Sequence, residues 1–375
     1  MRKNVFLCAV AAASAGFFSC ASKPAPGPVL APGPIFPLGE ESRIDFDGEL
    51  LGPLLAFGSD VVLSTASGRI VLVSPAEKKI LWQFAAKAPL AVPALAGSEF
   101  IIVFDQGGRI TRLSRDGKAA WEKAFTGAVS NPPALASGSI LAVFDRRTLR
   151  CFDPATGIEK WSWTADADLL AGPRSWGGTT VLLTAGKKAV LLSADGKPGL
   201  GFETSAAASG PLLISGDRMY AGFENGTFQS WDLRSRKRRW TVKTGAAPAA
   251  DPVADGARIY LVTEGRQLFA IDKKNGAVRW WQSLSGRAVG EAALCGGRLL
   301  APSLSPVLTA FDPPTGKKAE TNDLKQNVIA APLVLGGRVE VAVRDPVTLK
   351  ETLVILKGKP LPPPPAPKKN PIPGE

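Results

Sequence analysis

The chain has 375 residues, and 45% of them are hydrophobic, which provides for a large folded core and excludes a mainly disordered protein. It contains no histidine, which excludes Ser-His-Asp and Cys-His catalysis and removes the commonest metal ligand. The 45 Lys and Arg against 33 Asp and Glu give a net charge of +12. Such an excess favours anionic partners, such as acidic protein surfaces, lipid headgroups, polyanionic glycans or nucleic acid, with solubility alone as the alternative explanation.

Residues 1–19 are predicted to be a lipoprotein signal peptide. Two cations precede an apolar stretch, residues 5–18, that is too short to span a bilayer comfortably. The stretch is followed by a small residue, Ser19, and then Cys20, which resembles a bacterial lipobox and predicts lipidation of Cys20. Phe17 stands where a lipobox usually has Leu, so a plain secretory cleavage after residues 13–15 remains the alternative.

Proline-dense segments flank the part of the chain that is expected to fold, residues 41–358. Residues 20–40 are predicted to be a semi-rigid tether, and residues 359–375 a disordered tail. The residue after Cys20 is Ala rather than Asp, which resembles the outer-membrane sorting pattern of enteric bacteria. We therefore expect a lipid-anchored protein on the outer membrane, facing the periplasm, where nucleic acid is not a partner.

A proline and a tryptophan return about every 40 residues. The proline positions are Pro53, Pro93, Pro133, Pro173, Pro211, Pro252 and Pro332, with Ala292 in the one gap. The tryptophans, expected to be structural repeat residues, are Trp82, Trp121, Trp161, Trp240 and Trp280. A period of this length indicates one supersecondary unit copied many times, each packing against its neighbours.

Turn residues divide each unit into four short strands. In the sixth unit we expect strands over 251–253, 258–262, 267–271 and 278–282, separated by turns that contain Gly or Asn. Four antiparallel strands in about 40 residues is the size of a propeller blade.

Eight units can be counted, and the last one lacks its Trp strand. The eighth supplies strands around 331–335, 338–343 and 351–356, while residues 41–46 precede the first proline at the offset of a Trp strand. The sequence therefore predicts an all-β fold, an eight-bladed propeller of four-stranded antiparallel blades, closed by the N-terminal strand completing the last blade. Packing between blades is expected to be weakest where residues 199–202 and 319–320 replace the Trp of units four and seven.

The segments 151–161, 270–280 and 310–316 share a small residue, an Asp and a turn Gly, and the first two end in Trp. This pattern resembles the repeat of the PQQ-like (quinoprotein-type) β-propeller family, over residues 41 to 357. The resemblance implies that the Trp lies on the outer strand and packs between adjacent blades, and that the Gly makes the tight turn.

Within that family, a lipoprotein made only of an eight-bladed ring resembles the propeller subunit of the outer-membrane β-barrel assembly machinery. The resemblance implies a periplasm-facing scaffold that contacts an envelope protein. From the catalytic and metal-binding residues that are missing, we expect no enzymatic activity, cofactor or metal, and we expect a monomer. An envelope propeller that binds a ligand or glycan is an alternative. A quinoprotein-like dehydrogenase is another, although the chain has no adjacent cysteine pair and no insertions between blades to build a pocket.

Two sets of side chains remain to be assigned. Cys8 lies in the signal segment, and Cys151 and Cys295 fall in different repeats, where free buried thiols are expected. A basic hairpin in the fifth unit is a candidate partner-binding site, either for an acidic partner or for phosphate-bearing headgroups, with a merely solvated loop as the alternative. Its cations are Arg234, Arg236, Lys237, Arg238 and Arg239.

Overall fold

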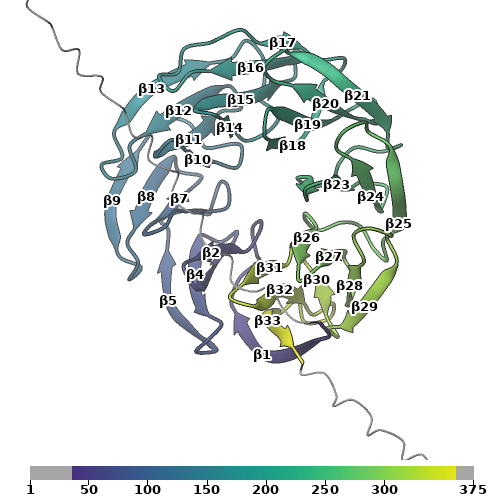
Figure 1. Cartoon of the computed structure of the whole chain (residues 1–375). Helices are drawn as coiled ribbons and strands as arrows, with labels where there is room; N and C mark the ends of the chain where they lie inside the picture. The colour runs from purple at the N-terminus through teal and green to yellow at the C-terminus, as the bar shows by residue number, and fades with distance from the viewer. Residues whose placement is uncertain (1–35, 360–375) are drawn as a thin grey trace, which may run out of the picture. The chain divides into compact units, whose positions relative to one another are not determined.

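The computed structural model describes residues 36–359, and these form eight antiparallel sheets arranged around an axis (Figure 1). The predicted fold class is confirmed: the chain is an eight-bladed propeller whose last blade is completed by the N-terminal strand. The predicted signal peptide, Cys20 and most of the tether and tail lie outside the described residues. In the part that is described, no helix is long and apolar enough to cross a membrane.

Each of the first four blades contains four strands in chain order, from the axis outwards. Blade 1 has β2 (Leu55–Phe57), β3 (Asp60–Ser64), β4 (Arg69–Ser74) and β5 (Lys79–Ala85). Blade 2 has β6 (Leu95–Ala96), β7 (Ile101–Phe104), β8 (Arg109–Leu113) and β9 (Ala119–Ala124). Blade 3 has β10 (Ala134–Ala136), β11 (Ser139–Phe144), β12 (Thr148–Phe152) and β13 (Glu159–Thr164). Blade 4 has β14 (Arg174–Trp176), β15 (Thr179–Thr184), β16 (Lys188–Leu192) and β17 (Phe202–Glu203).

The remaining blades repeat this order until the last, which takes strands from both ends of the fold. Blade 5 has β18 (Ala208–Ser215), β19 (Arg218–Phe223), β20 (Thr227–Asp232) and β21 (Lys237–Lys243). Blade 6 has β22 (Val253–Ala254), β23 (Arg258–Val262), β24 (Gln267–Asp272) and β25 (Val278–Ser283). Blade 7 has β26 (Ala293–Cys295), β27 (Arg298–Ala301), β28 (Val307–Phe311) and β29 (Lys318–Asp323). Blade 8 has β30 (Asn327–Val328), β31 (Leu333–Leu335), β32 (Arg338–Arg344), β33 (Glu351–Gly358) and β1 (Leu38–Phe46).

The burial of each strand follows its place in the blade. The two middle strands lie between neighbouring blades, so β3 is buried at all five positions and reads as a nearly continuous apolar run. The outer strands β5 and β13 alternate between exposed and half-buried residues, since only one of their faces packs on the ring.

The hydrophobic core is divided among the interfaces between blades. Each of the eight buried clusters combines side chains from two adjacent blades. Between blades 1 and 2, for example, Phe57 and Leu72 pack with Ile101 and Leu113, all of them almost fully buried. A single blade therefore has no core of its own, and the blades stabilise one another.

The five repeat tryptophans all make the same hydrogen bond to the next blade. The indole Nε1 of each donates a hydrogen bond of 2.8–3.1 Å to a backbone carbonyl of the following blade, 33 residues further along the chain. The donor and acceptor residues are Trp82 and Arg115, Trp121 and Pro154, Trp161 and Ala194, Trp240 and Lys273, and Trp280 and Pro313.

The same indole rings lie over a glycine of the following blade. A Cβ added to that glycine would lie 2.5–2.9 Å from the nearest indole atom, closer than real Cβ atoms approach. The five glycines have φ between 65° and 80°, and they are Gly117, Gly157, Gly196, Gly276 and Gly316. Glycine is thus required at this position for two reasons: the backbone is left-handed, and the indole ring leaves no room for a side chain.

Where the tryptophan is missing, the glycine is missing too. Lys78 of blade 1 and Arg236 of blade 5 occupy the equivalent turn position, with φ of 55° and 57°. The preceding outer strands have Ser42 and Leu200 at the Trp position, as their register with the neighbouring strands shows. Without an indole above it, the position tolerates a side chain at the cost of a strained φ.

Other contacts replace the tryptophan at the two seams where the sequence predicted the weakest packing. Between blades 4 and 5, Phe202 stacks on Trp231 with ring centroids 5.0 Å apart. Between blades 7 and 8, Glu320 stands at the Trp position, and its Oε1 accepts a 2.8 Å hydrogen bond from the backbone N–H of Leu38.

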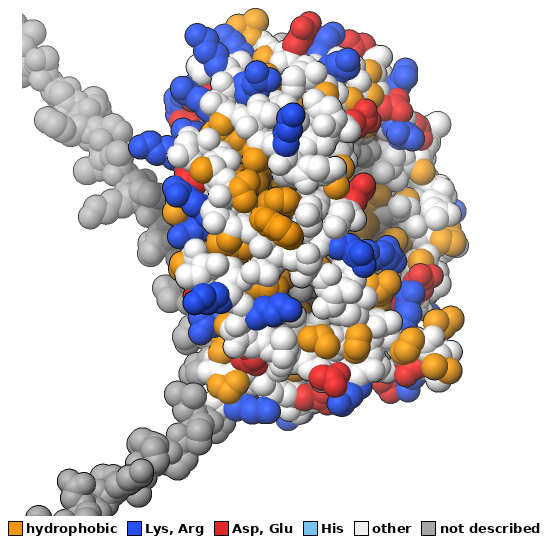
Figure 2. All heavy atoms as spheres, turned by 90° about the vertical axis from the view of Figure 1, so that its right-hand side faces the viewer, with side chains coloured by type: hydrophobic (Ala, Val, Ile, Leu, Met, Phe, Trp, Pro, Cys, Tyr) orange, Lys and Arg blue, Asp and Glu red, His pale blue; other side chains and the backbone are white. Residues whose placement is uncertain are grey.

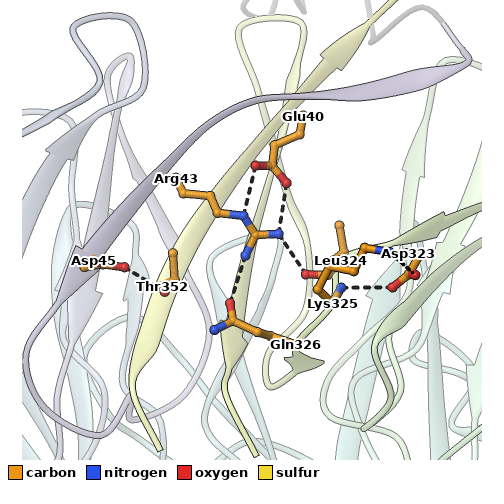
Figure 3. Close-up of polar contacts among 8 residues, drawn as sticks. All are labelled: Glu40, Arg43, Asp45, Asp323, Leu324, Lys325, Gln326 and Thr352. Atoms are coloured by element: carbon orange, nitrogen blue, oxygen red, sulfur yellow. Dashed lines mark hydrogen bonds and ion pairs between the residues drawn. The ribbon is translucent and has the colours of Figure 1, made fainter. Parts of the chain in front are cut away.

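Closure of the ring depends on β1, which pairs with β33 from Leu38 to Phe46. Arg43 connects this strand to the preceding connector: its guanidinium donates to the Leu324 carbonyl at 2.7 Å and to Gln326 Oε1 at 2.8 Å, while Glu40 accepts two further bonds (Figure 3). The strand begins three residues before the sequence-based boundary at 41, because Leu38 is buried in the cluster between blades 7 and 8.

Blade 8 also buries a carboxylate. Glu340, on β32, is fully buried, and neither of its carboxylate oxygens has a hydrogen-bond partner among the described residues. Burial raises the pKa of Glu340 to about 8. Blade 3 has Leu141 at the same register position, so this site ordinarily suits an apolar side chain.

The paired Trp and Gly can be tested with two glycines of similar φ. Gly276 (φ 78°) lies 2.8 Å from the Trp240 ring once a Cβ is added, whereas Gly138 (φ 71°) has nothing within 4 Å. Gly138→Ala is expected to cost about 1 kcal/mol of unfolding free energy from backbone strain, and Gly276→Ala about 1–3 kcal/mol more from overpacking. Chemical denaturation measures both, and Trp240→Ala should remove the added cost. Equal losses for the two glycine variants would contradict the role given to the indole.

Glu340 predicts a specific pH dependence of stability. Below about pH 4.5 the carboxyl is protonated in both the folded and the unfolded chain, and above it only the unfolded chain ionises until the folded pKa is reached. Stability is therefore lost as the pH rises through about 8, by the order of a few kcal/mol. Glu340→Gln should flatten the fall of Tm between about pH 5 and about pH 9, and the exposed Glu224→Gln should not. A Tm profile unchanged by Glu340→Gln would count against the buried neutral carboxyl.

Candidate functional site

The chain path gives the ring two different faces. On the turn face lie the turns that join the first to the second strand of a blade and the third to the fourth. On the connector face lie the turns between the second and third strands, together with the segments that lead from one blade to the next, such as residues 86–94 and 244–252.

A recess of about 700 Å³ surrounds the axis at the connector face. Four of the periodic prolines line it, together with small and aliphatic residues from all eight blades. These prolines are Pro53, Pro93, Pro133 and Pro211. The connectors approach closely here: a Cβ on Gly52 would lie 2.2 Å from the Pro93 ring. The prolines that recur once per blade therefore also form part of the wall of the axial recess.

Three charged side chains line this mostly apolar recess: Arg174, Asp251 and Glu291. Arg174 of blade 4 forms an ion pair with Asp251, which precedes blade 6. The other carboxylate oxygen of Asp251 accepts a 3.3 Å hydrogen bond from the backbone N–H of Leu212 in blade 5. Asp251 therefore fixes three blades relative to one another at the axis.

Glu291 lies beside this pair. Burial raises the pKa of its carboxyl, and the negative charge of Asp251 raises it further. The recess thus places the Glu291 carboxyl, whose neutral form is favoured, next to a partly exposed ion pair. The Arg174 and Asp251 side chains of this pair are 28% and 44% exposed. The sequence analysis missed this cluster. Its signal was a charged residue directly beside a periodic position, Asp251 before Pro252 and Glu291 before Ala292, where the other repeats have Gly, Val, Ala or Pro.

The basic hairpin connects β20 to β21 at the turn face. Arg234 forms an ion pair of 2.6 Å with Asp217, and Arg239 one of 2.6 Å with Asp232. The backbone N–H of Ser235 and the Arg239 guanidinium hold the pKa of Asp232 well below its usual range. The other three predicted partner-binding cations, Arg236, Lys237 and Arg238, are exposed and have no ion pair within residues 36–359.

The hairpin and the recess lie on opposite faces. Inner strand β18 begins beside the recess, where Gly210 and Pro211 line it, and ends at the turn that carries Asp217. Asp217 is the partner of Arg234, so the hairpin lies at the other end of the same blade. The predicted basic site and the structural recess are therefore separate surfaces.

Reactive groups are scarce in the described part of the chain. Within residues 36–359 no group of three or more Cys, Asp or Glu side chains is arranged to hold a metal ion. Cys151 and Cys295 are free and buried, as expected from the sequence, in the clusters between blades 3 and 4 and between blades 7 and 8. Burial raises the pKa of both thiols, that of Cys295 to about 12.

Fold and repeat together define a class, that of eight-bladed β-propellers built from PQQ-like repeats. The sequence profile described as outer membrane protein assembly factor BamB matches residues 40–146 and 145–290, which is more than half of the chain. The chain belongs to this family.

Individual relatives are distant. The BamB proteins of Moranella endobia and Shewanella oneidensis are 26% and 23% identical over 186 and 214 residues, which cover 44% and 52% of this chain. The matched part spans 47% and 54% of those relatives, about half their length. The Burkholderia pseudomallei BamB is 22% identical over 300 residues, 76% of this chain and 69% of that protein.

Solved structures resemble the fold. The crystal structure of BamB from Moraxella catarrhalis aligns with a TM-score of 0.71 at 13% identity, covering 86% of this chain and 98% of that one. The computationally designed Ika8 protein aligns with a TM-score of 0.68, also at 13% identity, covering 84% and 99%. These likenesses concern the architecture of the ring.

The buried thiols predict chemical inertness. In the folded protein, alkylation of Cys151 and Cys295 by iodoacetamide near pH 8 should be slower than in denatured protein by orders of magnitude, because the thiolate is disfavoured and shielded. Peptide mass spectrometry after timed alkylation measures each site separately. Rapid native alkylation of either residue would contradict the packing described for its cluster.

Proposed function

We propose that this protein is a non-enzymatic scaffold of the bacterial cell envelope that takes part in the assembly of outer-membrane β-barrel proteins. The family match over residues 40–290 carries the proposal. The structure supports a scaffold because its repeated side chains serve packing between blades, as Trp240 and Gly276 do. In this proposal the protein is held at the outer membrane by an acyl chain on Cys20 and faces the periplasm.

The docking site in this proposal is the axial recess of the connector face. Its wall of Pro, Gly, Ala and Leu side chains suits an apolar loop that projects from a protein partner. The partly exposed Arg174 and Asp251 supply a donor and an acceptor in the recess, which would orient such a loop. Eight short connectors, braced by Asp251 at the axis, keep this surface preorganised.

Site-specific photo-crosslinking in cells tests this role. A photoreactive residue at Ala249, which is exposed and lines the recess, should capture a component of the β-barrel assembly machinery. The same residue at Thr241, exposed on the outer strand β21, is the matched control and should not. A deletion strain should contain less β-barrel protein in its outer membrane.

Two results would contradict the proposal, the first its assembly role and the second its docking site. One is a deletion strain with normal amounts of barrel proteins, combined with no assembly component captured at either position. The other is capture at Thr241 but not at Ala249, which would leave the assembly role standing and move the docking site away from the recess.

A further inference from the structure

The turn-face end of blades 5 and 6 carries a large excess of positive charge. Residues 216–218, 232–239, 255–258 and 272–279, which we call the basic edge, contain ten Lys and Arg but four Asp. Figure 2 views the rim over β21, β25 and β29, and Lys and Arg side chains crowd one edge of this view.

The four carboxylates of the basic edge are already engaged. Each holds one arginine: Asp217 with Arg234, Asp232 with Arg239, Asp255 with Arg258 and Asp272 with Arg279. Arg218 donates to the Lys273 carbonyl, and Lys273 to Ser215. Four exposed cations are left without an ion pair among the described residues: Arg236, Lys237, Arg238 and Lys274.

The opposite end of the same two blades has no such excess. Its connectors and turns carry Lys243, Arg266 and Arg287 against Glu224, Asp251, Glu264 and Glu291. The positive charge is therefore a property of one face, and the overall charge of the chain does not account for it.

Exposed aliphatic side chains accompany these cations. Leu200 is 74% exposed and stands at the Trp position of blade 4, in the seam where Arg236 replaces the turn glycine of blade 5. Val278 begins the outer strand of blade 6, within the basic edge, and is 39% exposed. Cations flanked by exposed aliphatic side chains are typical of surfaces that rest on a lipid bilayer.

The ends of the folded part lie on this face too. Leu38 at the start of β1 pairs with Gly358 at the end of β33, where other blades have the turn between the third and fourth strands. The described part of the chain therefore begins and ends on the turn face. We propose that the basic edge binds the phosphate groups of anionic phospholipids, so that the ring rests with its turn face on the membrane and its axial recess directed away from it. This inference stands independently of the role in barrel assembly.

Vesicle binding by the full chain tests the proposal. The protein should partition more strongly onto vesicles of phosphatidylcholine with phosphatidylglycerol than onto phosphatidylcholine alone, and added salt should remove the difference. Replacement of Arg236, Lys237 and Arg238 by Glu should lower the partition coefficient on the anionic vesicles by about 100-fold or more. The same change at Lys187, Arg266 and Arg287, exposed on the connector face, is the matched control and should have a much smaller effect.

The outcomes separate lipid binding from its alternatives. Replacement of the three hairpin cations by Gln, with Tm measured for every variant, shows whether lost charge or lost folding explains a weaker partition. Equal losses in the hairpin and control variants, or equal binding to both kinds of vesicle, would overturn the proposal. So would a hairpin variant that binds anionic vesicles normally but loses a crosslinked acidic protein, because the basic edge would then serve a protein partner.

Discussion

The contact on which the ring depends is an indole lying on a glycine of the next blade. The indole of Trp240 needs a surface without a side chain, and Gly276 provides it while also adopting the left-handed φ of its turn. The hydrogen bond from Nε1 to the Lys273 carbonyl fixes the ring in place. No blade has a core of its own, so this contact joins two blades along the cluster that they share.

The three seams that lack this contact are the places where the ring departs from its repeat. Two of them flank blade 8, which contains both ends of the folded part. On the side of blade 7, polar contacts of Glu320 and Arg43 replace the indole. The third lies between blades 4 and 5, where Leu200 is exposed and Arg236 replaces glycine. Without an indole above it, the glycine position of this turn can hold Arg236, one of the exposed cations of the basic edge.

We assign a different function to each face of the ring: docking of a protein partner to the connector face, and binding of lipid to the turn face. The connector face is recessed and mostly apolar, and its ion pair of Arg174 and Asp251 braces three blades at the axis. The turn face carries the basic edge, at blades 5 and 6, and both ends of the folded part. In the orientation that we propose, with the turn face on a membrane, the recess points away from the lipid and remains free for a protein partner. A rigid ring joins the two contacts at a fixed separation.

The sequence by itself determined the number of blades, the strands within them and the closure by the N-terminal segment. It could do so because Trp, Pro and turn Gly recur at a constant spacing, and each copy reports the same local structure. It also located the basic hairpin, because a run of neighbouring cations is visible in the sequence without knowledge of the fold. The tertiary structure alone decided that Asp251 meets Arg174, 77 residues away, that Glu340 is buried without a partner, and that recess and hairpin occupy opposite faces. These features depend on which residues the closed ring brings together. A local sequence pattern contains no information about contacts between segments that are distant in the sequence.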